Sequence, residues 1–268
     1  MTVILPHAVL PHASAATLLP SERHPAARPV PPAPLSPALS KLLARLPVQD
    51  DGEALRQSLF HSGTHFNPDL LTSEAERRAR LEGVHAALDR AESLVFLDTE
   101  STGGRNGRLI EVALVETDVE QNVTGGLHFR CNPHRRSLAG ARRVHGIQDC
   151  ELEHCPEFAA RADELLEAVR GKTVVIHDRT MDLLWLNREL QAARPGAPRF
   201  EDRCTVVDSF VLARAIPSER RRNGLDALLE WYGLGARGGH HDAYGDAALL
   251  SRVFFELWWD LDEWLYGE

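Results

Sequence analysis

Several features that mark other classes of protein are scarce or missing in this sequence of 268 residues. No apolar run is long enough to span a bilayer, so we expect no membrane partner. The four cysteines show no C-x-x-C spacing, and the first ten residues lack the basic flank of a secretory signal. We therefore expect a cytoplasmic protein with reduced thiols.

Positive charge is also in short supply. The net charge of −9 argues against a protein that coats nucleic acid through a broad basic face. It leaves open an enzyme that holds a nucleic-acid end against metal ions, because local charge matters more there than the total.

The composition changes along the chain and predicts four parts. They are a disordered Pro/Ala-rich tail, a helical extension, a main domain and a C-terminal tail, over residues 1–36, 37–92, 93–260 and 261–268. In the extension, a capping Ser73 and apolar residues at helical spacing predict a helix over 73–91. Shorter helices are predicted over 38–46 and 51–60.

The main domain begins with strands and continues with helices. Strands are predicted from Leu94, over 108–119 and over 125–131, and their short links favour an antiparallel meander. A fourth strand is predicted over 173–176. Helices are predicted over 156–169, 181–193, 206–215, 224–232 and 242–259. Strands followed by alternating strands and helices predict an α/β fold with a mixed sheet.

The first predicted strand ends in two carboxylates. Four apolar residues from Leu94 run directly into Asp98, and Glu100 follows two positions later. Such a run is typical of a strand buried on both faces, and side chains two apart on a strand point to the same side. Neighbouring carboxylates resist ionising together unless a positive charge lies between them, and a divalent cation meets that need. The alternative is that Asp98 starts a turn and Glu100 is a solvated flank.

Three polar residues later in the chain complete a candidate site. Asp182 begins the helix after the fourth strand, and Asp246 lies in the first turns of the last long helix, five residues after His241. A two-metal phosphodiester hydrolase requires such a set, because two hard cations about 4 Å apart need several carboxylates. A histidine with a pKa near neutral suits the base. Taken alone, Asp182 would be an ordinary acid at a helix N-terminus.

Five motifs make the chain resemble a known family. They are Leu97–Gly103, Val144–Ile147, Val175–Asp178 with Asp182, Arg222–Leu228, and His241 with Asp246. In this order they resemble the DEDDh-type 3′–5′ exonucleases of the DnaQ-like branch, and the similarity covers about Leu94 to Leu257. Each motif is weak by itself, whereas the whole series is specific.

The resemblance implies a fold, cofactors and roles for the acids. The fold would be an RNase H-like mixed sheet flanked by helices, and the main domain would be an exonuclease domain. The cofactors would be two divalent cations, Mg²⁺ or Mn²⁺. Asp98 would bridge both cations, while Glu100 and Asp246 would complete the first site. Asp182 would hold the second cation through water, and His241 would be the general base.

Spacing within the last motif decides between neighbouring candidates for the base. His241 lies five residues before Asp246 and His240 lies six, so the resemblance selects His241. A sister class has a tyrosine in this role, but Tyr244 is too close to Asp246 to fill it. The alternative for this histidine pair is a solvated loop or an adventitious metal site.

The resemblance also implies contacts with the terminal nucleotide. His145 matches a family histidine that contacts this nucleotide, and Ser101 and Gly103 lie where a hydroxyl and the backbone can meet it. Taken alone, His145 would be a structural loop histidine. Basic residues that could meet phosphates, or form a solvated face, are Arg135, Arg136, Arg142, Arg143 and Arg220 to Arg222.

Several residues near the motifs are predicted to be structural. Asp208 should orient a helix, Asp226 should cap or pair within its own helix, and His177 should pack or hydrogen-bond. The sequence departs from the family at Asp178, where asparagine is usual, and at Met181, where phenylalanine is usual. Neither change touches the five catalytic positions.

Three functional hypotheses remain open at this stage. The first is a 3′–5′ exonuclease that releases nucleoside 5′-monophosphates from single-stranded ends, with DNA preferred. The second is an RNA-trimming enzyme of the RNase T or oligoribonuclease type. The third is a non-catalytic subunit that binds nucleic-acid ends or a polymerase, against which the intact acids argue. A polymerase, a sliding clamp met by Gln57 to Phe60, or a second copy of the chain are candidate partners.

Overall fold

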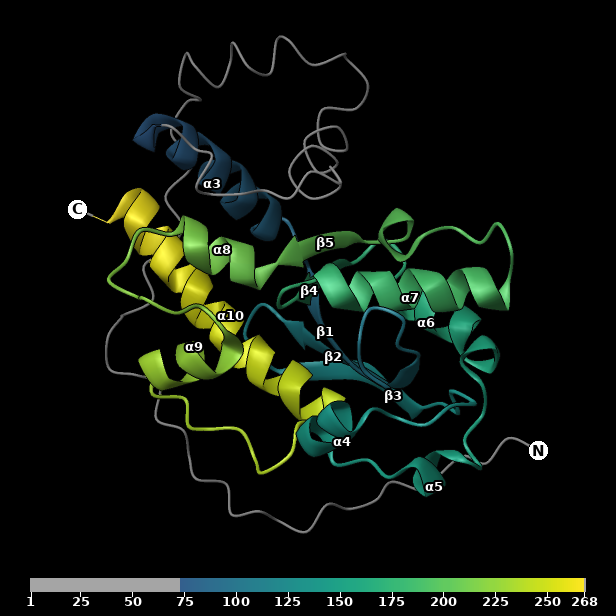
Figure 1. Ribbon diagram of the computed structural model, residues 1–268. Helices are drawn as coiled ribbons and strands as arrows, with labels where there is room; N and C mark the ends of the chain where they lie inside the picture. The colour runs from purple at the N-terminus through teal and green to yellow at the C-terminus, as the bar shows by residue number, and fades with distance from the viewer. Residues whose placement is uncertain (1–72, 268) are drawn as a thin grey trace. The chain divides into compact units, whose positions relative to one another are not determined.

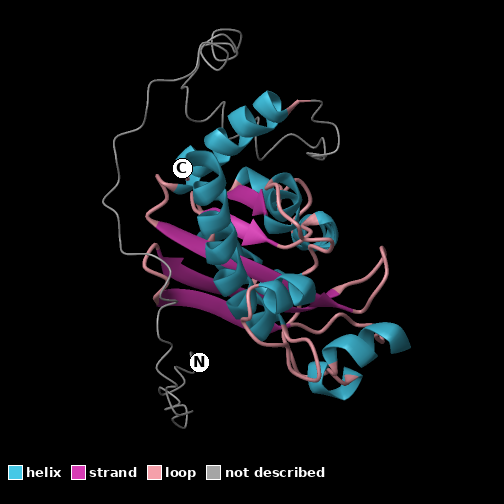
Figure 2. Ribbon diagram, turned by 90° about the vertical axis from the view of Figure 1, so that its left-hand side faces the viewer, coloured by secondary structure: helices cyan, strands magenta, loops and turns pink. Residues whose placement is uncertain are grey.

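The computed structural model describes residues 73–267, which contain one five-stranded sheet with helices on both faces (Figures 1 and 2). The strands are β1 Ser93–Ser101, β2 Leu109–Asp118, β3 Val123–Arg130, β4 Thr173–Ile176 and β5 Thr205–Asp208. Their order across the sheet is β3-β2-β1-β4-β5. The strands β1, β2 and β3 pair antiparallel, and β4 pairs parallel with β1 and with β5. The predicted mixed sheet with an antiparallel meander is confirmed.

The helices divide between the two faces of the sheet. The helices are α3 Glu74–Leu88, α4 Ala139–His145, α5 Asp149–Leu152, α6 Ala162–Ala168, α7 Thr180–Ala193, α8 Ser209–Ala215, α9 Leu225–Trp231 and α10 Ala243–Tyr266, with short 3₁₀ turns at Phe158–Ala160 and Phe200–Asp202. One core contains residues of α3, α8, α9 and α10, and the other contains residues of α6 and α7. No helix within residues 73–267 is long and apolar enough to cross a membrane.

Strand β1 lies in the middle of the sheet, and both of its faces are buried. Leu94 and Phe96 belong to the core under α10, whereas Val95 and Leu97 belong to the core under α7. A strand covered on both sides needs apolar residues at every position, which explains the unbroken run. The run stops at Asp98, where the strand approaches the edge of both cores.

Two ranges predicted as single helices each contain a further element. The range 206–215 was predicted as one helix, but β5 occupies its first residues and α8 begins only at Ser209. Val206 and Val207 are buried in the sheet beside β4, and β-branched residues suit that position. The range 156–169 is split, because a 3₁₀ turn precedes α6. The short helices α4 and α5 were not predicted.

The last helix runs to Tyr266, beyond the predicted end at Trp259. Its final turns share a core with Leu81 and Leu88 of α3, and His85 of α3 lies 3.0 Å from Asp262. The aromatic C-terminal segment therefore packs on a preceding helix. Some predictions lie outside the described residues: the tail at 1–36, the helices at 38–46 and 51–60, and the segment Gln57 to Phe60. The division of the chain into four parts stays a prediction.

Candidate active site

The end of β1 presents Asp98 and Glu100 on the face of the sheet that α10 covers. In the antiparallel register Asp98 lies opposite Ala113 and Glu100 opposite Glu111 of β2. Ala113 belongs to the core beneath α10, so both acids face that helix. Both side chains are half-buried. The predicted same-side projection of the two acids therefore places them beneath the N-terminal end of α10.

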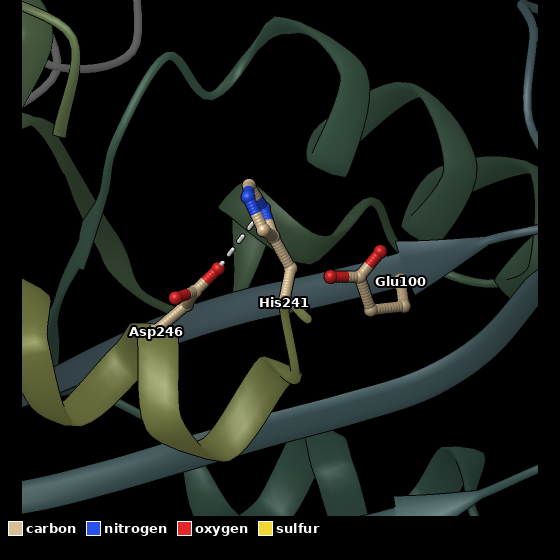
Figure 3. Close-up of side chains that lie close together, drawn as sticks. All are labelled: Glu100, His241 and Asp246. Atoms are coloured by element: carbon tan, nitrogen blue, oxygen red, sulfur yellow. Dashed lines mark ion pairs between the residues drawn. The ribbon is translucent and has the colours of Figure 1, made fainter. Parts of the chain in front are cut away.

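The beginning of α10 brings His241 and Asp246 to these acids. Asp242 caps the helix by accepting a hydrogen bond of 2.8 Å from the Gly245 N–H, which fixes the first turn. Ligand atoms of Glu100, His241 and Asp246 all lie within 4.8 Å of one another. Figure 3 shows Glu100 on the strand and Asp246 on the helix, with the ion pair between His241 and Asp246 dashed. These three groups could share one cation.

Asp182 reaches the same strand from the opposite side of the sheet. It lies in the first turn of α7, is buried, and accepts a hydrogen bond of 2.6 Å from the Thr99 hydroxyl. Asp208 orients the neighbouring segment, because it caps α8 and also accepts from the backbone N–H groups of Asp178 and Arg179. The prediction that Asp208 orients a helix is confirmed, and Thr99 is a contact that the sequence did not indicate.

The acids carry more negative charge than their surroundings balance. Burial, followed by the charges of Asp182, Glu100 and Asp246, raises the pKa of Asp98 well above its ordinary value. Burial raises the pKa of Glu100 to about 8, and the charges of Asp246 and Glu111 add to the effect.

The pKa values of the other two acids, Asp182 and Asp246, are also raised. Burial raises the pKa of Asp182 to about 7 in spite of the hydrogen bond from Thr99. Burial also raises the pKa of Asp246, although Arg237 and His241 oppose the rise. A set of acids with raised pKa values needs added positive charge to ionise together, and oxygen ligands of this kind suit a hard divalent cation.

One cationic side chain that the sequence did not indicate already lies among these acids. Arg237 Nη1 is 2.7 Å from Oδ2 of Asp246 and 2.7 Å from Nδ1 of His241. Its Nε lies 2.7 Å from Oδ1 of Asp226. Asp226 therefore pairs with the loop after α9, and the prediction that it caps or pairs within its own helix was wrong. The available signal was an arginine four residues before His241.

Glu111 of β2 is a second residue that the sequence did not indicate. Its buried carboxylate accepts hydrogen bonds of 3.1 Å from His128, 2.8 Å from Arg130 and 3.0 Å from the backbone N–H of Ala243. Burial would raise its pKa, but these hydrogen bonds outweigh burial and lower the pKa to about 2. Glu111 thus ties the first residue of α10 to the sheet. An acid inside the apolar run from Leu109 to Val115 was the signal for it.

His145 lies at the end of α4, next to the segment that carries His241. The backbone N–H of His241 donates to the carbonyl of Val144 at 2.9 Å. His145 is buried, and its Nδ1 accepts from the Ile147 N–H at 3.0 Å. Its Nε2 has no hydrogen-bond partner within residues 73–267. A buried nitrogen without a partner is available to a ligand.

The loop after β1 packs against α4 and forms the other wall of this region. Ser101 is buried, and its hydroxyl accepts from the Gly103 N–H at 3.2 Å. Gly103 has a φ of +91°, and a Cβ there would lie 2.9 Å from the Cβ of Ala141. Glycine is therefore required at this close approach.

Several of the arginines predicted to meet phosphates contact other residues of the protein. Arg220 is buried and hydrogen-bonds Asp260 and Tyr232, so it cannot meet a phosphate. Arg142 pairs with Asp149, and Arg222 is exposed beside Glu230. His177 was predicted to pack or hydrogen-bond, and it does so with Ser209 at 2.9 Å and with the ring of Phe210.

Comparisons with known proteins identify the family of this chain. The family model described as Exonuclease matches residues 95–254. DNA polymerase III subunit epsilon of Rickettsia felis is 34% identical over 168 residues, which cover 61% of this chain and 72% of that protein. The protein of the same name from Escherichia coli K12 is 33% identical over 172 residues, covering 61% of this chain and 70% of that protein.

A solved structure gives the same fold. The structure titled Exonuclease I (apo) superposes with a TM-score of 0.51 at 20% identity. The match covers 65% of this chain and 42% of that one, so the chain spans less than half the length of this structural neighbour. The family model covers more than half of the chain, and the resemblance inferred from the motifs is confirmed. The chain belongs to the exonuclease family and is a DnaQ-like 3′–5′ exonuclease.

Proposed function

We propose that this enzyme uses divalent cations to hydrolyse the terminal phosphodiester bond of a single-stranded DNA 3′ end and releases nucleoside 5′-monophosphates. The observation that carries the proposal is the convergence of Glu100, Asp246 and His241, with ligand atoms within 4.8 Å, beside Asp98 and Asp182. Such a set costs stability unless positive charge is bound among the acids.

The proposal assigns each acid a role as a ligand. Asp98 would be a ligand of both cations, Mg²⁺ or Mn²⁺, since the charges of Asp182, Glu100 and Asp246 all raise its pKa. Glu100 and Asp246 would complete the first site, and Asp182 would hold the second cation through water. Divalent cations bound there would supply positive charge to the attacking and leaving oxygens of an in-line displacement.

His241 has the geometry of a general base. Its side chain is 36% exposed, so water can reach it, and it lies 3.5 Å from Asp246. In the proposed step His241 takes a proton from the attacking water as the new phosphorus–oxygen bond forms. The bond to the 3′ oxygen of the preceding nucleotide breaks, and that oxygen leaves on the shortened strand. The released nucleotide keeps the phosphate on its 5′ side.

The terminal nucleotide is assigned to the region between α4 and the loop after β1. The unpartnered Nε2 of His145, the Ser101 hydroxyl and the backbone at Gly103 are the proposed contacts. Burial lowers the pKa of His145, so its ring is neutral near pH 7 and donates or accepts a hydrogen bond without carrying charge.

DNA is proposed over RNA on the names of the relatives. Those compared above are subunits of a DNA polymerase, which favours DNA as the polymer and a polymerase as a partner. The 2′-hydroxyl is the group that would separate the two polymers at this site.

The test is the digestion of 5′-labelled single-stranded DNA and RNA of equal sequence, with Mg²⁺, with Mn²⁺ and with chelator. Wild-type enzyme should shorten DNA from its 3′ end only when a cation is present. Glu100→Gln should lose this activity, while the exposed matched control Glu153→Gln should keep it. Faster trimming of RNA than of DNA would contradict the proposed substrate. Trimming in the presence of chelator would contradict the proposed metal dependence.

A further inference from the structure

We propose that Arg237 is the resident counter-ion of the cation-free site and must leave Asp246 and His241 before the enzyme can work. The inference rests on the proposed metal-dependent function. It concerns an arginine on the loop between α9 and α10, to which the motifs gave no role.

The contacts of Arg237 place one guanidinium at the position where a cation is needed. Its Nη1 lies 2.7 Å from Oδ2 of Asp246, the carboxylate that also lies nearest to His241. The side chain of Arg237 is 16% exposed and that of Asp246 is 6% exposed, so water screens the pair weakly. Asp246 cannot offer Oδ2 to a divalent cation while this bond persists, because the two positive charges would compete for one oxygen.

The same nitrogen also hydrogen-bonds to the candidate base, His241. Arginine carries only N–H donors and stays protonated, so a contact of 2.7 Å requires Nδ1 of His241 to accept. A neutral histidine with an accepting Nδ1 carries its proton on Nε2. Neither ring nitrogen is then free to take a proton from water. One arginine therefore withholds a cation ligand and the base together.

The surroundings of Arg237 allow it to move away. The loop contains glycines at 233, 235, 238 and 239, and glycine restricts the backbone least. A Cβ at Gly239 would meet nothing within 4 Å, so this part of the loop is not packed tightly. Asp226 lies 2.7 Å from Nε, and its side chain is 70% exposed. It offers the displaced guanidinium a partner outside the acid cluster.

Competition of this kind predicts a specific effect on cation affinity. Removing the guanidinium frees Asp246 Oδ2, so Arg237→Gln should bind a divalent cation roughly tenfold more tightly than wild type. Arg237→Lys keeps the charge but lacks the planar fork, so its affinity should fall between the two. The matched control is Arg222→Gln, which removes an exposed arginine that pairs with Glu230.

The experiment is calorimetric titration of the four proteins with Mn²⁺ alone. Tighter binding by Arg237→Gln with an unchanged Arg222→Gln would support the inference. Equal or weaker binding by Arg237→Gln would overturn it, and so would equal tightening in both variants, since that would be a general effect of charge. If wild type and all variants bind no Mn²⁺ at millimolar concentration, the proposed metal site itself fails.

A measurement on unaltered protein covers the case in which the variants do not fold. Nitrogen NMR of the imidazole should show His241 with its proton on Nε2 in chelator. Mg²⁺ should shift the Nδ1 signal of His241 as the arginine leaves. An Nδ1 signal that is the same with and without bound Mg²⁺ would show that Arg237 stays in place, and the inference would be wrong.

Discussion

Two acids on helix α10 have similar partners and different roles. Asp260 accepts a hydrogen bond of 2.6 Å from Arg220 and one of 2.5 Å from the Tyr232 hydroxyl. Asp246 accepts one of 2.7 Å from Arg237 and lies beside the ring of His241. Each acid thus has one arginine and one ring, at opposite ends of the same helix.

The difference lies in what surrounds each pair. The Arg220 side chain is 1% exposed and also donates to the carbonyl of Ala213, so its position is fixed from several sides. Asp246 shares its arginine with two further acids, Glu100 and Asp98, whose pKa values burial raises. A balanced pair therefore stabilises the fold, whereas an acid cluster with too little positive charge is prepared to bind a cation.

The largest expected effect comes from removing one acid of the cluster. Asp98→Asn should lower the rate of DNA trimming by roughly 10³-fold, because it removes a cation ligand and leaves the shape unchanged. In chelator its melting temperature should equal or exceed that of wild type, since a buried acid is relieved of its neighbours. Trimming rates and melting curves check both parts.

The matched variant at the other end of the helix is Asp260→Asn. At temperatures below its melting temperature, Asp260→Asn should trim DNA at a rate within about twofold of the wild-type rate, because Asp260 belongs to the structural pair. A large loss of activity in Asp260→Asn would contradict the distinction between the two acids.

The next largest effect is on stability. Arg220→Met should lower the free energy of unfolding by about 3 kcal/mol, because it leaves Asp260 without its ionic partner. Denaturant unfolding gives this value directly. Arg237→Gln should lower the free energy of unfolding by less than Arg220→Met does, since the acids beside Arg237 can take up protons instead. Equal losses of unfolding free energy in the two variants would contradict the distinction between the two arginines.

Glu111→Gln should change the response to acid. The pKa of Glu111 is about 2 in the folded protein and about 4.5 by its ordinary value, so its charge stabilises the fold above pH 4.5. This contribution, about 3 kcal/mol for a shift of this size, disappears as the pH falls from 4.5 to 2. Between pH 4.5 and 2, the free energy of unfolding of Glu111→Gln should therefore fall less steeply with decreasing pH than that of wild type, as measured by acid unfolding. A curve parallel to that of wild type would mean that the hydrogen bonds from Arg130 and His128 contribute nothing.

The smallest effect concerns cation binding and pH. The pKa values of Glu100 and Asp182 are raised to about 8 and about 7, so both acids are partly protonated near neutral pH. A cation must displace those protons, and each proton displaced should raise its affinity by up to about tenfold per pH unit between pH 6 and 8. Titrations in buffers of different ionisation enthalpy measure the protons released. An affinity that does not depend on pH would contradict the raised pKa values.

The sequence predicted the parts of the site that lie on regular elements. Asp98 and Glu100 share a face because the period of a strand is two, and Asp182 and Asp246 lie in the first turns of predicted helices. The resemblance supplied their joint role. Strand periodicity could not reveal that Thr99, on the opposite face, donates to Asp182.

The sequence missed the contacts that only tertiary structure creates. Arg237 is four residues from His241 in a glycine-rich loop, and no periodicity indicates where such a loop leads. Glu111 is tied to Ala243 across 132 positions of the chain. At β5 the apolar residues Val206 and Val207 continue into those of α8, so a buried strand and a helix looked alike.

The most direct test of the site is the position of bound cations in crystals grown with Mn²⁺ and thymidine 5′-monophosphate. Anomalous scattering should show two Mn²⁺ ions at the carboxylates of Asp98, Glu100, Asp182 and Asp246, with Asp98 shared between them. The guanidinium of Arg237 should have left Asp246. Crystals of active enzyme without Mn²⁺ at these carboxylates would contradict the proposed mechanism.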